Sequence, residues 1–327
     1  MSNHGEIFEK SLPVLASAKK LRLDGLGEPS LVPDIPEKLE WIKTFNPDIK
    51  VHMVTNTTGF LNKKRAKRIL SNIDDLHISL NGVKNREKVM IDSSNKLLKK
   101  ALLNISQIKK ELGYPKVTCG FIIMRDIIDD IVPAKRLCKT LGFDGITYKD
   151  LWINSPSLNT QSIQHDTDLK SKAIRNLKKA QSIDMHQHTF PQNLLAKEKE
   201  NKLEKNSNAI LNKVKTYYNR IKESKNVPCS APWDTIKIRY TGEVKLCCFG
   251  DTSIGDLRNQ SFDDIWNGEE ANNYRTGMQS GNYYKDCSRC HVVTDSLEVY
   301  EKYKRKEKYK NIAESDISKS DKDPIKV

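Results

Sequence analysis

The sequence lacks both a long apolar run and a recognisable export signal. Its 327 residues are 37% hydrophobic and 7% aromatic, and the longest apolar stretch, Gly120 to Met124, is far too short to cross a bilayer. The opening residues, MSNHGEIFEK, show no basic segment followed by an apolar one. We therefore expect a cytoplasmic protein with no membrane partner.

Cysteine is scarce, with seven in the chain, and its use does not suggest disulfides. Without an export signal the thiols are expected to stay reduced or to bind metal. The net charge of +14 would suit a polyanionic partner. The basic residues are mostly Lys, scattered and not interleaved with aromatic residues, so we expect solvated helix faces and no nucleic-acid partner.

The first 150 residues alternate short β-branched runs with longer helical patterns. The runs occur at Lys20 to Asp24, Val51 to Thr55, Leu76 to Leu80, Lys116 to Met124 and Gly145 to Tyr148. This alternation predicts an α/β fold with a parallel sheet, open or closed into a barrel, and with function at the carboxyl ends of its strands.

Composition divides the chain into four expected parts. Residues 1–163 carry the α/β pattern, and residues 164–226 are polar, charged and helical, as a linker would be. Residues 227–294 are rich in Gly, Cys and aromatic side chains, which indicates a small metal-stapled domain. Residues 295–327 are charged and poor in apolar residues, which predicts a disordered tail.

Four cysteines near the C-terminal end are the main candidates for chemistry: Cys229, Cys247, Cys287 and Cys290. The Thr-Gly turn between TIKIRY and EVKLCC predicts a hairpin that returns Cys247 or Cys248 toward Cys229. Cys287 and Cys290 add two thiolates from one turn. Four soft thiolates suit an iron–sulfur cluster or a zinc ion, and spacing alone does not separate the two.

This region resembles the SPASM/Twitch auxiliary-cluster domain of radical S-adenosylmethionine (radical SAM) enzymes. The resemblance covers residues 227–293 and includes the spacing Cys-x12-Gly-x4-Cys, then Cys-x2-Cys, and the connector IGDLRNQSFDDIWNGEEANNYRTG. It implies that Cys247 rather than Cys248 is a ligand. It also implies one auxiliary 4Fe-4S cluster on Cys229, Cys247, Cys287 and Cys290, since no cysteine follows Cys290.

The N-terminal region resembles the radical SAM barrel. The motifs are LRLDGLGEPSLVPD, with Gly25, Gly27, Glu28 and Pro29, then VHMVTNTTGFL, with Asn56, and DDLHISLNG, with Ser79. The resemblance implies a partial (β/α) barrel over residues 1–163 that lacks its first strand. It also implies that these six residues bind S-adenosylmethionine.

One departure concerns the family's Cys-x3-Cys-x2-Cys loop, which holds the catalytic 4Fe-4S cluster and is missing from this sequence. Cys119 and Cys138 lie too far apart to substitute, and we expect both to be buried. The sequence either starts late, at an internal methionine, or belongs to a degenerate remnant, and we favour the late start. A catalytic cluster is expected only if that missing segment exists.

The resemblance implies an oxidoreductase-type enzyme that modifies a small-molecule or carbohydrate substrate. In the family, a deoxyadenosyl radical abstracts hydrogen, the auxiliary cluster passes an electron, and flavodoxin or ferredoxin serves as reductant. A peptide-modifying maturase is the alternative enzyme. The non-enzymatic alternative is a binding or scaffold protein whose C-terminal domain is stapled by zinc or a cluster.

Overall fold

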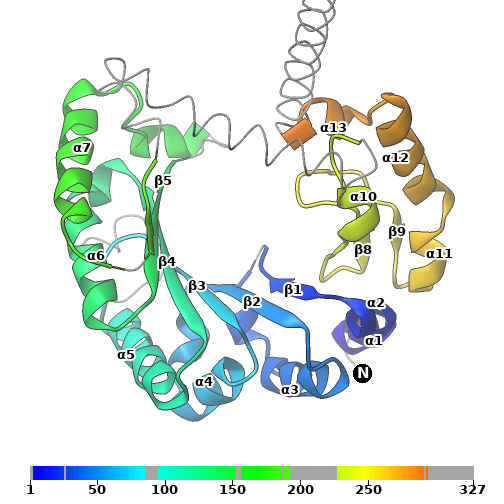
Figure 1. Ribbon diagram of the computed structural model, residues 1–327, viewed down its shortest axis with the longest axis horizontal. Coiled ribbons are helices and arrows are strands. Elements are labelled where there is room, and N and C mark those ends of the chain that lie inside the picture. Colours follow the sequence, from blue (N-terminus) through cyan, green and yellow to red (C-terminus); the bar gives the residue numbers. More distant parts are fainter. Residues whose placement is uncertain are drawn as a thin grey trace, which may run out of the picture. The chain divides into compact units, whose positions relative to one another are not determined.

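The computed structural model describes residues 3–25, 27–84, 95–151, 156–185, 187–191, 227–290 and 292–293. The chain forms two compact units, shown in Figure 1. The sheet unit comprises Leu15–Asn201, and the cysteine unit comprises Met1–Val14 with Lys202–Val327. The boundary between them falls within helix α2 (Leu12–Ser17).

The sheet unit contains six parallel strands in sequential order. They are β1 (Lys20–Leu23), β2 (Lys50–Thr55), β3 (Asp75–Ser79), β4 (Lys116–Ile123), β5 (Gly145–Asp150) and β6 (Gln187–Thr189). The first five confirm the predicted strands and the α/β class. The sixth was not predicted, because a run of three residues shows no readable alternation.

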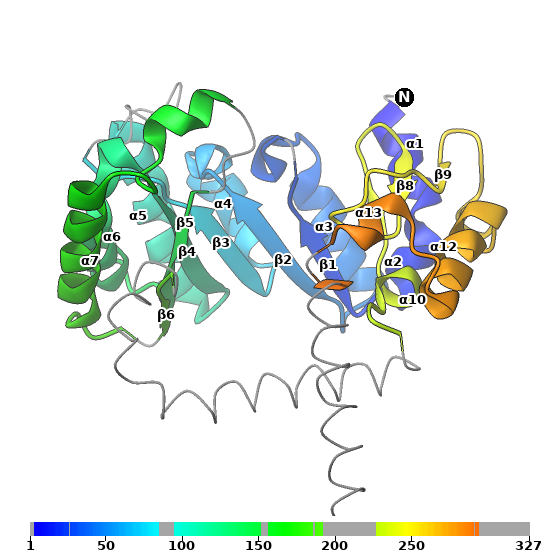
Figure 2. The same cartoon turned by 90° about the horizontal axis from the view of Figure 1, so that it is seen from above.

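Five helices accompany the strands: α3 (Ile35–Phe45), α4 (Lys63–Leu70), α5 (Asn95–Leu112), α6 (Ile131–Thr140) and α7 (Thr167–Gln181). Figure 1 shows them along one side of the curved sheet, and α6 and α7 lie side by side in Figures 1 and 2. Short 3-10 helices follow four strands: η1 (Pro29–Leu31), η2 (Thr58–Phe60), η4 (Arg125–Asp130) and η5 (Pro156–Gln161).

The core of this unit lies between the sheet and its helices. Val51 and Met53 on β2 are fully buried, while His52 between them is only half-buried, as the two-residue period of a strand requires. Helix α5 buries Leu98 and Ile105 at helical spacing. The opposite face of the sheet therefore carries the more polar, half-buried side chains.

Two aspartates organise the amino edge of the sheet in the same way. The N–H of Val51 donates to Asp74 Oδ2 (2.9 Å) and the N–H of Asp74 donates to the Val51 carbonyl (2.8 Å). Asp144 makes the same pair of bonds with Val117, at 2.6 and 2.8 Å. Each pair fixes the start of one strand against the turn before the next.

The sheet unit continues past the boundary that composition placed at residue 163. Helix α7 and strand β6 lie in the expected linker, and β6 pairs with β5. Residues 192–226 of that linker and the expected tail at 295–327 lie outside the described residues. Among the described residues, no helix is both long and apolar enough to span a bilayer.

The cysteine unit contains a small antiparallel sheet of β7 (Lys237–Ile238), β8 (Glu243–Lys245) and β9 (Gly255–Asp256). Its helices are α1 (Asn3–Lys10), α10 (Ala231–Asp234), α11 (Phe262–Trp266), α12 (Glu269–Ser280) and α13 (Lys285–Ser288). The predicted hairpin is present as β7 and β8. Gly242 turns the chain between them with φ of 93°, a conformation that favours glycine.

Helix α1 packs into the core of this unit, although the sequence analysis grouped it with the barrel. Ile7 is 8% exposed and lies in one apolar cluster with Val244, Leu257 and Ile265. Lys10 Nζ donates to the Arg258 carbonyl (3.1 Å). The N-terminal residues therefore stabilise a domain that lies more than two hundred residues further along the chain.

Candidate functional site

The loop after β1 carries four of the candidate ligand residues. Gly25 has φ of 130° and Gly27 has φ of 108°, and an added Cβ would meet nothing within 4 Å at either position. Glycine is therefore favoured there by backbone conformation rather than by lack of space. Pro29 begins η1, where its missing N–H costs nothing, and Glu28 precedes it as the N-cap.

Glu28 links this loop to the carboxyl end of β2. Its Oε1 accepts hydrogen bonds from the N–H of Ser30 (3.1 Å) and from Thr55 Oγ1 (2.6 Å). Its Oε2 accepts from the N–H of Asn56 (2.6 Å). Both oxygens thus bind protein groups, and the carboxylate determines where the glycine loop lies beside β2.

The remaining candidates lie at the ends of β2 and β3. Asn56 follows β2, and its Oδ1 accepts from the N–H (3.0 Å) and Oγ1 (2.6 Å) of Thr58. Ser79 ends β3, and the pairing of Thr55 with Ile78 places Asn56 beside Ser79 in the parallel register. The structure therefore brings all six candidates to the carboxyl edges of three neighbouring strands. Their role as cofactor ligands stays a prediction.

Sequence reasoning missed the residue that organises the loop after β3. Asp130, fully buried, accepts through Oδ2 from the N–H groups of Val83 (2.7 Å) and Lys84 (2.8 Å). In the same loop Asn81 has φ of 26°, and its Oδ1 accepts from the N–H of Ile122 (3.2 Å). No local pattern could identify Asp130, because its partners lie more than forty residues earlier in the chain.

His77 is a second missed residue, on the half-buried face of β3. Its Nδ1 lies 2.9 Å from Thr118 Oγ1 on β4. Burial, and then the positive charges of Lys149 and His52, lower the pKa of His77 to about 4. The ring is therefore neutral at physiological pH.

The four candidate thiolates come together in the cysteine unit. Cys229, Cys287 and Cys290 pack against one apolar cluster formed by Val227, Met278 and Val293. Burial, followed by the charges of Cys247, Cys229 and Cys290, raises the pKa of Cys287 to about 12. The sulfurs of Cys229, Cys247 and Cys290 are therefore near enough to Cys287 for their charges to affect its pKa.

Cys247 differs from its neighbour Cys248 in surroundings. Cys247 is half-buried, and its Sγ accepts a hydrogen bond from the N–H of Gly250 (3.0 Å), whereas Cys248 is exposed. The charge of Cys247 is the largest charge effect on the pKa of Cys287 after burial. This arrangement supports the prediction that Cys247 is the ligand.

The donor set fits a soft cationic group. Mutually repelling thiolates are stabilised by a metal centre that neutralises their charge, and both iron–sulfur clusters and zinc do this. The four cysteines are neighbours, but within the part of the chain that the structure describes no three or more His, Cys, Asp or Glu side chains are arranged as a group that could hold a metal ion, so their role as ligands stays a prediction.

Comparison with known proteins identifies this region. Residues 229–291 match the SPASM family, an iron-sulfur cluster-binding domain. The fold resembles SuiB of Streptococcus suis, with 14% identity and a TM-score of 0.55 over 88% of this chain and 64% of that one. It also resembles anSMEcpe with bound AdoMet, with 13% identity and a TM-score of 0.52 over 96% of this chain and 90% of that one.

The chain therefore shares the fold of SuiB and anSMEcpe, and its residues 229–291 match a SPASM domain. It spans 64% of the length of SuiB. SuiB has also been solved with S-adenosylmethionine and with its precursor peptide SuiA. No curated protein matches the chain.

The connector of the SPASM domain links its helices to the Cys229 segment. Ser261 and Asp264 form a capping box that starts α11. On α12, Arg275 stacks on the Trp266 ring, 4.5 Å from its centroid, and its Nε donates to the Pro232 carbonyl (3.0 Å). Pro232 lies three residues after Cys229, so these contacts position the first thiolate.

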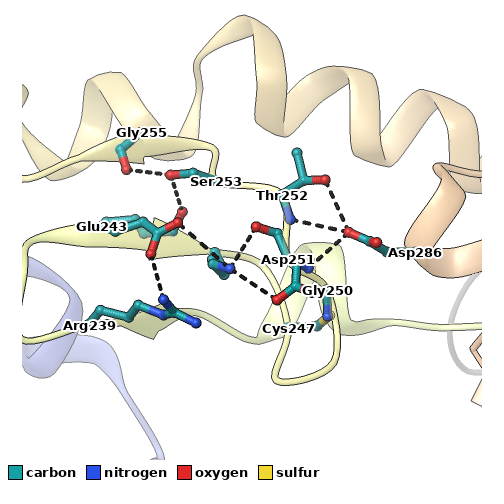
Figure 3. A network of polar contacts seen from close by, with 11 residues as sticks. Arg239, Glu243, Cys247, Gly250, Asp251, Thr252, Ser253, Gly255 and Asp286 are labelled. Atoms are coloured by element: carbon teal, nitrogen blue, oxygen red, sulfur yellow. Dashed lines mark hydrogen bonds and ion pairs between the residues drawn. The ribbon is translucent and has the colours of Figure 1, made fainter. Parts of the chain in front are cut away.

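A second network in the SPASM domain surrounds the loop after Cys247 (Figure 3). Asp286 accepts hydrogen bonds from the N–H groups of Asp251 and Thr252. Burial alone would raise the pKa of Asp286, but these hydrogen bonds outweigh it and hold the pKa below its usual range. On the other side of the loop Lys245, 3% exposed, donates to the Asp251 carbonyl (2.6 Å).

Proposed function

We propose that this protein binds one auxiliary 4Fe-4S cluster through Cys229, Cys247, Cys287 and Cys290, and S-adenosylmethionine at the carboxyl edge of its sheet. The observation that supports the proposal is that all four cysteines lie in the segment that matches the SPASM family, where Cys229, Cys247 and Cys290 are near enough to act electrostatically on Cys287. Thiolates neutralise iron charge and occupy all four corners of such a cluster.

S-adenosylmethionine supplies the radical chemistry of this proposed reaction. The chain's own residues bind and orient it. The backbone of Gly25 and Gly27 would meet its methionyl end, and Glu28 positions that backbone through its bonds to Thr55 and Asn56. Asn56 and Ser79 would contact the cofactor from the neighbouring strand ends.

We propose a peptide as the first substrate class to test. The support is the likeness of the fold to SuiB, which has been solved with its precursor peptide. The small-molecule or carbohydrate substrate expected from a single auxiliary cluster stays a prediction. Flavodoxin or ferredoxin is the proposed electron donor.

A second candidate function is a cluster-binding scaffold that performs no radical chemistry. It is favoured by the cysteine inventory of this sequence, which contains no Cys-x3-Cys-x2-Cys loop. Cys119 and Cys138 are both fully buried, and burial raises the pKa of Cys119 well above its usual range. Neither thiol is suited to hold an exposed catalytic cluster.

Anaerobic reconstitution of this chain, followed by iron and sulfide analysis, tests the cluster proposal. We expect about four irons and four sulfides per chain, because one such cluster contains that number. One zinc without sulfide would overturn it. Equilibrium dialysis with S-adenosylmethionine then tests the cofactor site, and cleavage of the cofactor on addition of dithionite would reject the scaffold.

A further inference from the structure

One carboxylate connects the two cysteine-bearing segments of the SPASM domain. Asp286 Oδ2 accepts three hydrogen bonds: from the N–H of Asp251 (2.9 Å), the N–H of Thr252 (3.1 Å) and Thr252 Oγ1 (3.0 Å). Figure 3 shows the carboxylate facing these donors. Because Asp286 immediately precedes Cys287, these bonds link the Cys287–Cys290 segment to the loop that begins at Cys247.

The backbone of Asp251 is held at both its N–H and its carbonyl group. Its N–H donates to Asp286, and its carbonyl accepts from the Nζ of the buried Lys245 (2.6 Å). The residue before it, Gly250, donates its N–H to Cys247 Sγ (3.0 Å). Holding the Asp251 backbone in place restrains the adjacent Gly250, whose N–H donates to the sulfur.

Hydrogen bonds to the sulfurs are one of the main determinants of the reduction potential of an iron–sulfur cluster. Residues that orient metal ligands without touching the metal typically change affinity by about 10- to 100-fold when they are replaced. Asp286 bears on both the affinity and the reduction potential of a cluster. It joins the two segments that carry the cysteines, and it holds the loop whose Gly250 N–H donates to Cys247.

We propose that Asp286 is a positioning residue for the auxiliary cluster. It keeps the Cys247 loop in register with the Cys287–Cys290 segment and preserves the Gly250 N–H···Sγ bond. The proposal rests on the proposed function, because it requires that the four cysteines bind a cluster.

The test uses the reconstituted full chain and four variants: D286A, D286N, T252V and D251N. D286A should release iron to a chelator at least about tenfold faster than the unmodified protein. D286N keeps an acceptor oxygen and should recover part of this loss, while T252V removes one of the three bonds and should show a smaller loss. D251N is the control, because the Asp251 side chain is 92% exposed and makes a long ion pair with Lys245 (3.6 Å), while the backbone groups that the proposal uses are unchanged.

The midpoint potential of the cluster distinguishes the effect of positioning the loop from the effect of removing the Asp286 charge. D286A and D286N lose the same negative charge, so the difference between their potentials reports the loop contacts. We expect D286A to have the lower potential of the two, because losing the N–H···Sγ bond destabilises the more negative, reduced cluster.

Two outcomes would overturn the inference: equal iron release from D286A and the unmodified protein, or equal potentials for D286A and D286N. If circular dichroism shows D286A to be unfolded, the T252V variant is the test. An iron-release rate of T252V equal to that of the unmodified protein would then reject the inference. Absence of a cluster in the unmodified protein would instead reject the proposed function.

Discussion

Glu28 in the sheet unit and Asp286 in the SPASM domain each accept backbone N–H groups from a loop beside a candidate ligand site. Their supports differ. Glu28 binds the end of β2, where Thr55 is 2% exposed and Met53 fully buried. Asp286 lies on α13, a four-residue helix with no buried residue. We therefore expect the glycine loop beside Glu28 to be ordered by folding alone. The Cys247 loop beside Asp286 should be fully ordered only when its thiolates bind the proposed cluster.

The largest expected effect comes from removing a thiolate. Cys247→Ala should lose most of the bound iron, because three thiolates leave one corner of the cluster without a ligand. Cys248→Ala is the matched control and should retain about four irons, since Cys248 is exposed whereas Cys247 is half-buried and accepts the Gly250 N–H. Iron and sulfide analysis after anaerobic reconstitution measures both. Iron loss from Cys248→Ala but not from Cys247→Ala would reverse the ligand assignment.

Removing the cluster tests whether the Asp286 loop, unlike the Glu28 loop, depends on the cluster for its order. Chelation of iron should sharply increase amide exchange in residues 247–252 and 285–290, because binding energy at such a site is also folding energy. Exchange in β2 and in the loop held by Glu28 should not change. Hydrogen–deuterium exchange of the loaded and chelated protein measures this, and equal changes in both loops would contradict the comparison.

Replacing Glu28 should destabilise the sheet unit with or without the cluster. Glu28→Ala leaves Thr55 Oγ1 and the Asn56 N–H without their acceptor, which should cost about 2 kcal/mol of unfolding free energy. Urea denaturation of this unit measures it, and Glu28→Gln should cost less because it keeps an acceptor.

Glu111→Gln is the control for this change, because Glu111 makes only exposed ion pairs with Lys63 and Lys67. It should alter stability by less than about 0.5 kcal/mol. A Glu28→Ala protein as stable as this control would show that the glycine loop does not depend on the carboxylate.

The smallest expected effect concerns the amino edge of the same sheet, far from any candidate ligand. Burial alone would raise the pKa of Asp74, but hydrogen bonds from Lys43 and the Val51 N–H outweigh it and hold the pKa below its usual range. Because the folded pKa is depressed, Asp74 stabilises the fold above its unfolded pKa of about 3.9, and this contribution is lost as pH falls through the folded pKa.

The stability difference between the unmodified protein and Asp74→Asn should therefore shrink below about pH 4, by on the order of 1 kcal/mol. Urea denaturation at neutral pH and near pH 3 measures it. A difference that stays constant across this range would mean that the Asp74 charge does not stabilise the strand start.

Much of the sheet and of the cysteine site could be predicted because the signals are local. The five longer strands show β-branched runs between helical patterns, and Gly25 and Gly27 mark a turn whose positive φ values favour glycine. The Thr-Gly turn at Gly242 likewise predicted the hairpin of β7 and β8, after which Cys247 follows.

Other parts could not be predicted, because their contacts join distant segments. Asp130 is one of many acidic residues until folding brings it to Val83 and Lys84. Strand β6 is too short to show a period, and it becomes a strand only because β5 offers an open edge for pairing. Ile7 gives no sign of its place in the core of the SPASM domain.

The sequence by itself determined the class of the fold and the position of the glycine loop, because each depends on a local pattern, and it supplied the four candidate cysteines. Only the tertiary structure decided which carboxylates hold the two loops and which residues complete the SPASM core. Glu28, Asp286 and Ile7 act through partners that folding places beside them, and the burial and hydrogen bonding that select those partners exist only in the packed chain.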